Sequence, residues 1–349
     1  MGSNYWQESL KGRISRRRAL TATGGTALGA AFLAACGGGS DKGETKGGTK
    51  DASGLLSEPV DTTKQAVRGG TLKRSNATNP PNLDPLQQTG AVALYETVVG
   101  RLVGFKPGLL TSQGEGDVDG DLCESWEFSP DRLQITLKMR PGIKWHNIAP
   151  VNGRDVDVDD VLFTWKRFSS VGAQRTALAN SVNPDAPILS MTAPDSKTIV
   201  VKMKDPIVYA LSMLGGRENV NLMPKEAENP GVLDPRAKLI GTGPYYLGDF
   251  QPSIGYTLKR FDGFYDKRYS FVDQIDYPAV PEYAAALAQL KAGNIHTYAV
   301  RQEEIVGFKK DVSDLSPYTS GFSSQGNKLI FGWKTPQLRD ERVRQAYLG

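Results

Sequence analysis

The chain contains 349 residues, of which 39% are hydrophobic, and it carries a formal net charge of +4 at pH 7. Residues 1–36 hold five basic residues and one acidic residue, which accounts for the whole of this charge. The rest of the chain is therefore close to neutral and lacks the basic surface with which proteins neutralise nucleic-acid phosphates. We expect no nucleic-acid partner.

The N-terminal segment has the pattern of an export signal. Arg16 and Arg17 precede a weakly apolar stretch that ends in small residues and Cys36. A membrane span needs about twenty predominantly apolar residues, whereas the run 19–35 has seventeen, including several Thr and Gly residues. Residues 1–35 are therefore predicted to be a twin-arginine lipoprotein signal peptide, with Cys36 as the lipidation site. We expect an extracytoplasmic protein, lipid-anchored to the bacterial cell membrane.

The segment after Cys36 is predicted to be a disordered tether over residues 36–65. It begins with Gly, Ser, Thr, Lys, Asp and Glu, which cannot bury enough apolar surface to offset chain entropy. Beyond it the only cysteine is Cys123, which has no partner for an internal disulfide. Its position beside Leu122 favours a small buried hydrophobe.

Periodicity predicts a mixture of helices and strands from Gly69 onwards. Two short alternating segments around Ser129-Pro130-Asp131 indicate a hairpin with one buried face. Such an order indicates an α+β fold rather than a repeated βαβ barrel. The predicted strands are Thr71–Ser75, Trp126–Phe128, Gln134–Met139, Thr198–Met203 and Tyr256–Arg260, and the predicted helices are Asp155–Ser169, Glu282–Ala292 with Gly293 as its C-cap, and one that begins near Asp340.

Candidate chemistry is sparse. Beyond Cys36 the chain offers His146, His296 and Cys123, without a metal, nucleophile or phosphate motif. The acidic run 155–160 could suggest calcium, but a calcium loop needs spaced oxygens and a late bidentate Glu. We interpret this run as a helix start, where the helix dipole favours acidic residues. No catalytic residue, metal site or cofactor is expected, and an enzyme is the disfavoured alternative.

A series of short motifs follows in order along residues 69–349. They are Gly69–Leu72, Leu83–Pro85, Leu122–Asp131, Leu137–His146, Asp159–Phe163, Gly241–Tyr245, Leu290–Ile295 and Asp340–Ala346. Each motif alone is weak, and each has a structural explanation such as a turn or a core aromatic residue. The ordered series resembles the family 5 extracellular solute-binding proteins of ABC importers, the peptide- and nickel-binding group.

The resemblance implies a two-lobed periplasmic-binding-protein-like α+β fold of type II, similar to cluster C. Lobe one would take residues 66–98 and 207–315, with a subdomain at 99–206, and lobe two would start within 316–349. The second lobe is then largely missing. We therefore expect the sequence to be an incomplete reading of a longer protein.

The resemblance also implies where a ligand would lie. In relatives a peptide pairs with a short segment from each lobe, and the lobe-one segment corresponds to Thr89, Gly90 and Ala91. A plain loop before a helix at Val92 is the alternative interpretation of that segment. The positions Ala299, Val300 and Arg301 lie where relatives line the cleft, and Trp333 is a hypothesis at the hinge. Arg301 could hold a carboxylate, or it could be an ordinary solvated arginine.

The expected function is that of a substrate-binding lipoprotein. It would capture peptides or similar small solutes outside the membrane, as a monomer, and deliver them to an ABC permease and its ATPase. Nickel chelates, oligosaccharides and opines are alternative ligands within the same family. A non-transport envelope scaffold lipoprotein is the alternative outside it.

Overall fold

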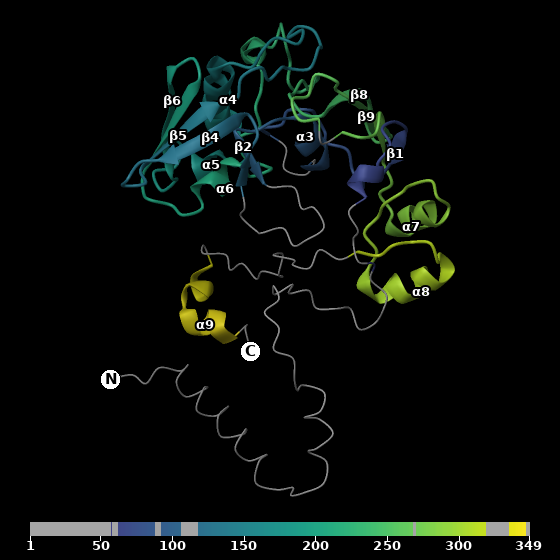
Figure 1. Ribbon diagram of the computed structural model, residues 1–349. Helices are drawn as coiled ribbons and strands as arrows, with labels where there is room; N and C mark the ends of the chain where they lie inside the picture. The colour runs from purple at the N-terminus through teal and green to yellow at the C-terminus, as the bar shows by residue number, and fades with distance from the viewer. Residues whose placement is uncertain are drawn as a thin grey trace, which may run out of the picture. The chain divides into compact units, whose positions relative to one another are not determined.

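The computed structural model describes residue 57 and residues 62–87, 92–105, 118–267, 270–318 and 335–346 (Figure 1). These residues belong to one compact unit, Ser53–Gly349. Arg16, Arg17 and Cys36 lie outside the described residues. In the described part, no helix has the length and apolar character that a membrane crossing requires.

A first four-stranded sheet has the order β1-β10-β9-β8. Its strands are β1 (Thr71–Lys73), β10 (Gln274–Pro278), β9 (Gly255–Arg260) and β8 (Tyr245–Gln251). β1 runs parallel to β10 with Leu72 opposite Ile275, and the other pairs are antiparallel. Helix α3 (Val92–Val98) buries Leu94 and Val98 in the same apolar cluster as Leu258 of β9. One core is therefore built from segments almost two hundred residues apart.

A second four-stranded sheet is wholly antiparallel, with the order β4-β5-β7-β6. Its strands are β4 (Cys123–Phe128), β5 (Gln134–Met139), β7 (Thr198–Met203) and β6 (Ile188–Asp195). Helix α4 (Val158–Val171) packs on this sheet through Val161 and Phe168, which share a buried cluster with Leu137 and Val201. Alternation of apolar and polar residues in β5 and β7 buries one face of the sheet.

The remaining described elements are short. Strands β2 (Val103–Phe105) and β3 (Val118–Gly120) form an antiparallel pair. The other α-helices are α5 (Arg175–Leu178), α6 (Ala210–Leu214), α7 (Tyr283–Lys291), α8 (Ile305–Asp311) and α9 (Glu341–Ala346). The 3-10 turns are η1 (Thr63–Gln65), η2 (Lys225–Glu228), η3 (Gln302–Glu304) and η4 (Pro336–Arg339).

Most predicted elements are confirmed, with corrections at their ends. The β4–β5 hairpin and strand β7 are present, and Cys123 is a free, buried residue as predicted. The first strand ends at Lys73 rather than Ser75. The predicted helix start at Asp155 is wrong, because Asp155 forms an antiparallel bridge with Lys144 and α4 begins at Val158.

The start of α4 is fixed by its cap. The carboxylate of Asp157 accepts a hydrogen bond from the Asp160 backbone N–H at 3.1 Å, and the Asp160 carboxylate accepts one from the Asp157 N–H at 3.1 Å. This reciprocal pair satisfies two N–H groups that a helix start otherwise leaves without partners. The acidic run is therefore used as a helix start, and its first residue is extended.

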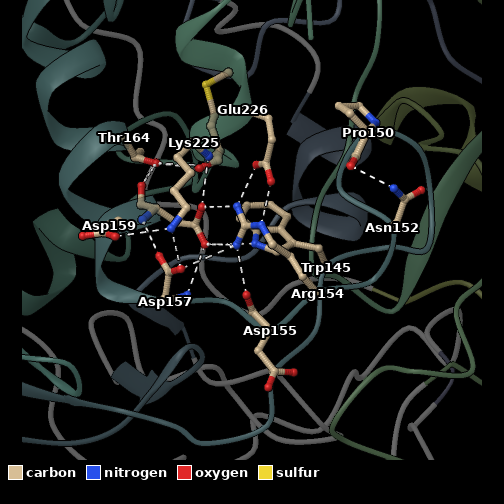
Figure 2. A network of polar contacts seen from close by, with 12 residues as sticks. Trp145, Pro150, Asn152, Arg154, Asp155, Asp157, Asp159, Thr164, Lys225 and Glu226 are labelled. Atoms are coloured by element: carbon tan, nitrogen blue, oxygen red, sulfur yellow. Dashed lines mark hydrogen bonds and ion pairs between the residues drawn. The ribbon is translucent and has the colours of Figure 1, made fainter. Parts of the chain in front are cut away.

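The Asp160 carboxylate is fully buried and accepts hydrogen bonds from several chain segments. Figure 2 shows the network around Arg154, with its neighbours Trp145 and Lys225 labelled. Arg154 donates to the two oxygens of Asp160 at 2.8 and 2.6 Å, and the Trp145 indole N–H donates at 3.0 Å. The Lys225 backbone N–H donates at 3.0 Å. Burying a carboxylate costs several kcal/mol unless donors replace its water, and these donors do so. The network joins α4 to the segment before it and to η2.

Arg154 extends this network to a second carboxylate. Its Nε and Nη2 donate to Glu226 at 2.7 Å each, so one guanidinium bridges two acids. These hydrogen bonds hold the pKa of the Glu226 carboxyl below its usual value. Hydrogen bonds to Asp160 are the main reason that the pKa of Arg154 is raised above its ordinary value. The contact with Arg154 therefore contributes stabilisation that requires the ionised Glu226 carboxylate.

The His146 ring is hydrogen-bonded to the chain at the Thr242-Gly243-Pro244 turn. Its Nδ1 accepts from the Gly241 N–H at 3.2 Å, and its Nε2 lies 3.0 Å from the Gly243 carbonyl oxygen. A neutral ring protonated at Nε2 satisfies both contacts, because Nδ1 then accepts and Nε2–H donates. The ring is fully buried, and burial lowers the pKa of His146 to about 4. The folded protein therefore holds this histidine neutral.

We expect Asp160→Asn to lower the free energy of unfolding by about 3 kcal/mol or more. The amide removes one of the two carboxylates that pair with Arg154 and turns an N–H group toward donors inside a buried network. The matched control is Asp159→Asn, one residue earlier in α4, whose side chain is 69% exposed and lies 3.3 Å from Lys225. That change should cost less than about 1 kcal/mol. Urea unfolding measures both, and equal losses would contradict a dominant role for Asp160.

We expect His146 to make stability fall as the pH is lowered from about 6.5 towards 4. Its folded pKa is depressed to about 4, so between these values only the unfolded chain binds the proton, and stability falls by up to about 1.4 kcal/mol per pH unit. Above pH 6.5 the contribution is complete. Urea unfolding of wild type and His146→Gln at pH 7.5, 6, 5 and 4.5 tests this. The variant should show a flatter profile, and parallel profiles would rule out His146 as the cause.

Candidate functional site

The predicted segment Ala299–Arg301 lies between helices α7 and α8. Helix α7 ends at Lys291, and Gly293 turns the chain with φ of +71°, a conformation that glycine adopts without strain. The chain then meets β1, where the His296 N–H donates to the Lys73 carbonyl at 2.8 Å. The Lys73 N–H donates to Nδ1 of His296 at 3.3 Å. These hydrogen bonds to β1 therefore fix the position of the chain just before Ala299.

The Arg301 side chain is exposed but oriented by an aromatic ring. Its guanidinium carbon lies 4.1 Å from the centroid of the Tyr283 ring, at the start of α7. The Arg301 backbone N–H donates to the Tyr283 hydroxyl at 2.9 Å, and that hydroxyl donates to Glu304. Stacking on a ring leaves the edges of a planar guanidinium open to donate two parallel hydrogen bonds to a carboxylate. Arg301 is therefore a preorganised candidate for an anionic group.

A pocket of about 710 Å³ opens beside this segment. Ala299 and Val300 line it, whereas Arg301 does not. The remaining lining residues are Leu290, His296, Thr297, Tyr298, Ile305, Phe308, Lys309, Asp314, Leu315, Ser316, Pro317 and Tyr318. Its walls are a mixture of aliphatic and aromatic side chains with a few polar groups, which is typical of sites for small organic ligands.

The charged lysine in this wall is committed to the protein. Nζ of Lys309 donates to the Ser313 carbonyl at 2.6 Å and to the Leu315 carbonyl. It therefore holds the 313–315 loop against α8. The pocket consequently offers apolar surface and a few polar side chains, among them the Asp314 carboxylate, and Arg301 lies next to its lining residue Val300 in the chain.

Other predicted site residues are not placed. Thr89, Gly90, Ala91 and Trp333 lie outside the described residues. Sequence reasoning did not identify Tyr283 and Glu304, because residues 18 and 3 positions away from Arg301 carry no local pattern that points to it. Their roles follow only from the way α7 and η3 meet.

In the part of the chain that the structure describes, no group of three or more His, Cys, Asp or Glu residues could hold a metal ion. The carboxylates of the acidic run are engaged instead with Lys144, Arg154 and Lys225.

Comparison with known proteins gives a consistent picture. Residues 117–347 match the sequence profile of the bacterial extracellular solute-binding proteins, family 5, middle region. The chain is 27% identical over 308 residues to a putative ABC transporter peptide-binding protein of Brucella ovis, covering 85% of this chain and 54% of that protein. It is 24% identical over 321 residues to the dipeptide-binding protein of Escherichia coli, covering 82% of this chain and 55% of that protein.

A solved structure shows the same fold. The ABC transporter-associated periplasmic binding protein DppA of Helicobacter pylori, in complex with the peptide STSA, superposes with a TM-score of 0.61. It is 22% identical, and the match covers 71% of this chain and 50% of that protein. The fold is thus that of the two-lobed periplasmic binding proteins. The chain spans about half the length of the relatives that it matches.

We expect Tyr283 to order the Arg301 side chain. An aromatic ring beneath the guanidinium shifts the NMR signal of its Nε–H group upfield by ring current. Tyr283→Phe keeps the ring and should retain this shift, whereas Tyr283→Leu should lose it and leave Arg301 mobile. An arginine-selective ¹⁵N spectrum reports both. If the Arg301 signal is the same in Tyr283→Leu as in wild type, the stacking does not persist in solution.

Proposed function

The chain belongs to the family 5 bacterial extracellular solute-binding proteins, and from that premise we propose that it captures peptides outside the cytoplasmic membrane for an ABC importer. The observation that carries this proposal is the family match, which extends over about two thirds of the chain. Peptides are the preferred ligands because the Brucella and Escherichia coli relatives are both described as peptide- or dipeptide-binding proteins. The protein would bind its ligand without converting it.

The proposed domain division follows from which segments share a sheet. Strands at 71–73 and 245–278 build the first sheet, and strands at 123–203 build the second. The two sheets support a separate lobe and subdomain. The bounds, with lobe one at 66–98 and 207–315, a subdomain at 99–206 and a second lobe that begins at 316, rest on the family resemblance. The candidate pocket reaches Tyr318, so it would lie where the two lobes meet.

Ligand recognition would combine backbone and charge. An extended peptide would lie along Ala299 and Val300, which line the pocket, and its terminal carboxylate would be held by Arg301. The orientation of Arg301 on Tyr283 supports this role. Thr89–Ala91 and Trp333 would complete the cleft, on the strength of the family resemblance alone.

The cellular setting is also a proposal. Twin-arginine export through Arg16 and Arg17 and acylation of Cys36 rest on the sequence pattern. A lipid-anchored monomer would deliver its peptide to a membrane permease driven by a separate ATPase. The family description as extracellular solute-binding proteins supports a location outside the cytoplasm.

We expect a peptide with a free C-terminus to raise the melting temperature of this chain. A ligand that binds only the folded state at about a hundred times its Kd adds roughly 2.7 kcal/mol, which is several degrees for a protein of this size. Thermal unfolding with a panel of di- to tetrapeptides measures the shift. The same peptides with amidated C-termini should give a smaller shift, because they lack the carboxylate.

Arg301→Met separates the carboxylate contact from the rest of the site. It should weaken free-acid peptides by about tenfold, since a charge-assisted hydrogen bond is lost, and leave amidated peptides unchanged. The matched control is Lys310→Met, an exposed cation in α8. Stabilisation by an opine or a metal chelate, but by no peptide, would contradict the peptide assignment within the same family. No shift with any of these solutes would contradict a binding function for this chain.

A further inference from the structure

A second pocket, of about 530 Å³, shares no lining residue with the pocket at Ala299. It is lined by the end of α3, by the β2–β3 pair and by the segment that follows β9. Three arginines face it, namely Arg101, Arg140 and Arg217. Their hydrogen bonds decide what this pocket can hold.

Arg101 is a buried cation with unused donors. Only 8% of the surface of Arg101 is exposed. Nη1 donates to the side-chain oxygen of the buried Asn221 at 3.2 Å, whereas Nε is buried without a hydrogen-bond partner. Among the described residues, neither Nε nor Nη2 of Arg101 contacts a carboxylate. Arginine remains charged in proteins, and a buried charge is normally paired.

The nearest acid is occupied by other donors. The Asp121 carboxylate accepts from the Arg101 backbone N–H at 2.8 Å and from the Tyr265 hydroxyl at 3.1 Å. It compensates the arginine charge at a distance but does not engage the guanidinium. Burial lowers the pKa of Arg101, which shows that the environment penalises its charge. An acceptor within the pocket would remove that penalty.

Arg140 supplies a second open guanidinium. Its Nε donates to the Asp121 carbonyl at 3.1 Å, and its guanidinium carbon lies 4.9 Å from the Tyr265 ring centroid. No ion pair with a carboxylate engages Arg140 in the described part of the chain. Arg217, in contrast, is paired with Glu96. Two of the three arginines therefore present N–H groups that no carboxylate of the described residues engages.

We propose that this pocket binds a small monocarboxylate, which takes the Nε–Nη2 edge of Arg101 in two parallel hydrogen bonds and a further one from Arg140. That edge has the spacing of a carboxylate, which is why arginine recognises carboxylates bidentately. Four acidic residues line the same pocket, namely Glu96, Asp119, Asp121 and Asp266. Glu96 is paired with Arg217, and the others would repel a second negative charge on the ligand. Dicarboxylates and phosphate should bind less tightly than monocarboxylates. The site is independent of the peptide function proposed for Ala299–Arg301.

The test is a titration of the full chain, labelled with ¹⁵N-arginine, with sodium propionate at constant ionic strength. The Nε–H signal of Arg101 should move downfield and saturate, because a new acceptor forms a hydrogen bond with it. Sodium chloride should leave this signal unchanged, and succinate should require higher concentrations than propionate. A site that fails here leaves peptide binding untouched, and peptide binding that fails leaves this titration interpretable.

Arg140→Gln keeps the test valid if replacing Arg101 prevents folding. The variant should retain the wild-type melting temperature and weaken propionate by about tenfold. The matched control is Arg132→Gln, an exposed arginine stacked on Phe128, which should bind propionate as wild type does. The proposal is overturned if the Arg101 signal does not saturate, if chloride moves it equally, or if Arg140→Gln binds propionate with unchanged affinity.

Discussion

The buried carboxylate of Asp160 is the constraint on which the arrangement of the described chain depends. It must be met by donors, and those donors come from Trp145, Arg154 and the backbone of Lys225. The first of these residues immediately precedes His146, whose ring holds the turn at 241–243. Positions 145 and 146 thus point to two different partners, one toward α4 and one toward the segment that leads into β8. A buried polar network is stabilising only when each member is satisfied, and here that requirement locks segments that are distant in sequence.

Local sequence patterns were sufficient to predict the elements whose own residues determine their conformation. The β4–β5 hairpin and β7 follow the apolar alternation of their residues, and α7 follows its apolar period to within one residue at each end. The start of α4 was misplaced because acidic residues look alike in sequence, while only Asp157 caps the helix and Asp155 pairs with Lys144. The parallel pairing of β1 with β10 carried no signal, since about two hundred residues separate them. Burial of apolar side chains decides which strands share a sheet. The sequence of a short segment does not indicate which distant strand it will pair with.

At the candidate sites, too, the sequence indicated some residues, whereas others could be identified only from contacts between distant segments. Family resemblance indicated Ala299 and Val300, and the structure places both in the wall of a pocket. The resemblance could not indicate that Arg301 is stacked on Tyr283, because that contact depends on how α7 and α8 are joined. Arg101 was not singled out at all, since an arginine in an apolar stretch gives no sign of whether a carboxylate will reach it. Its open edge becomes visible only when Asn221 and Asp121 are placed around it.

The most direct test of the binding account is photocrosslinking from the wall of the pocket. A photoreactive benzoylphenylalanine in place of Val300, irradiated with a tetrapeptide that stabilises the chain, should become covalently attached to the peptide. Excess unreacted peptide should suppress the product, and the same probe at Val232, which is 52% exposed and outside the pocket, should give none. Crosslinks at Val232 equal to those at Val300, or none at Val300 while the peptide is bound, would contradict the placement of the ligand at Ala299–Arg301.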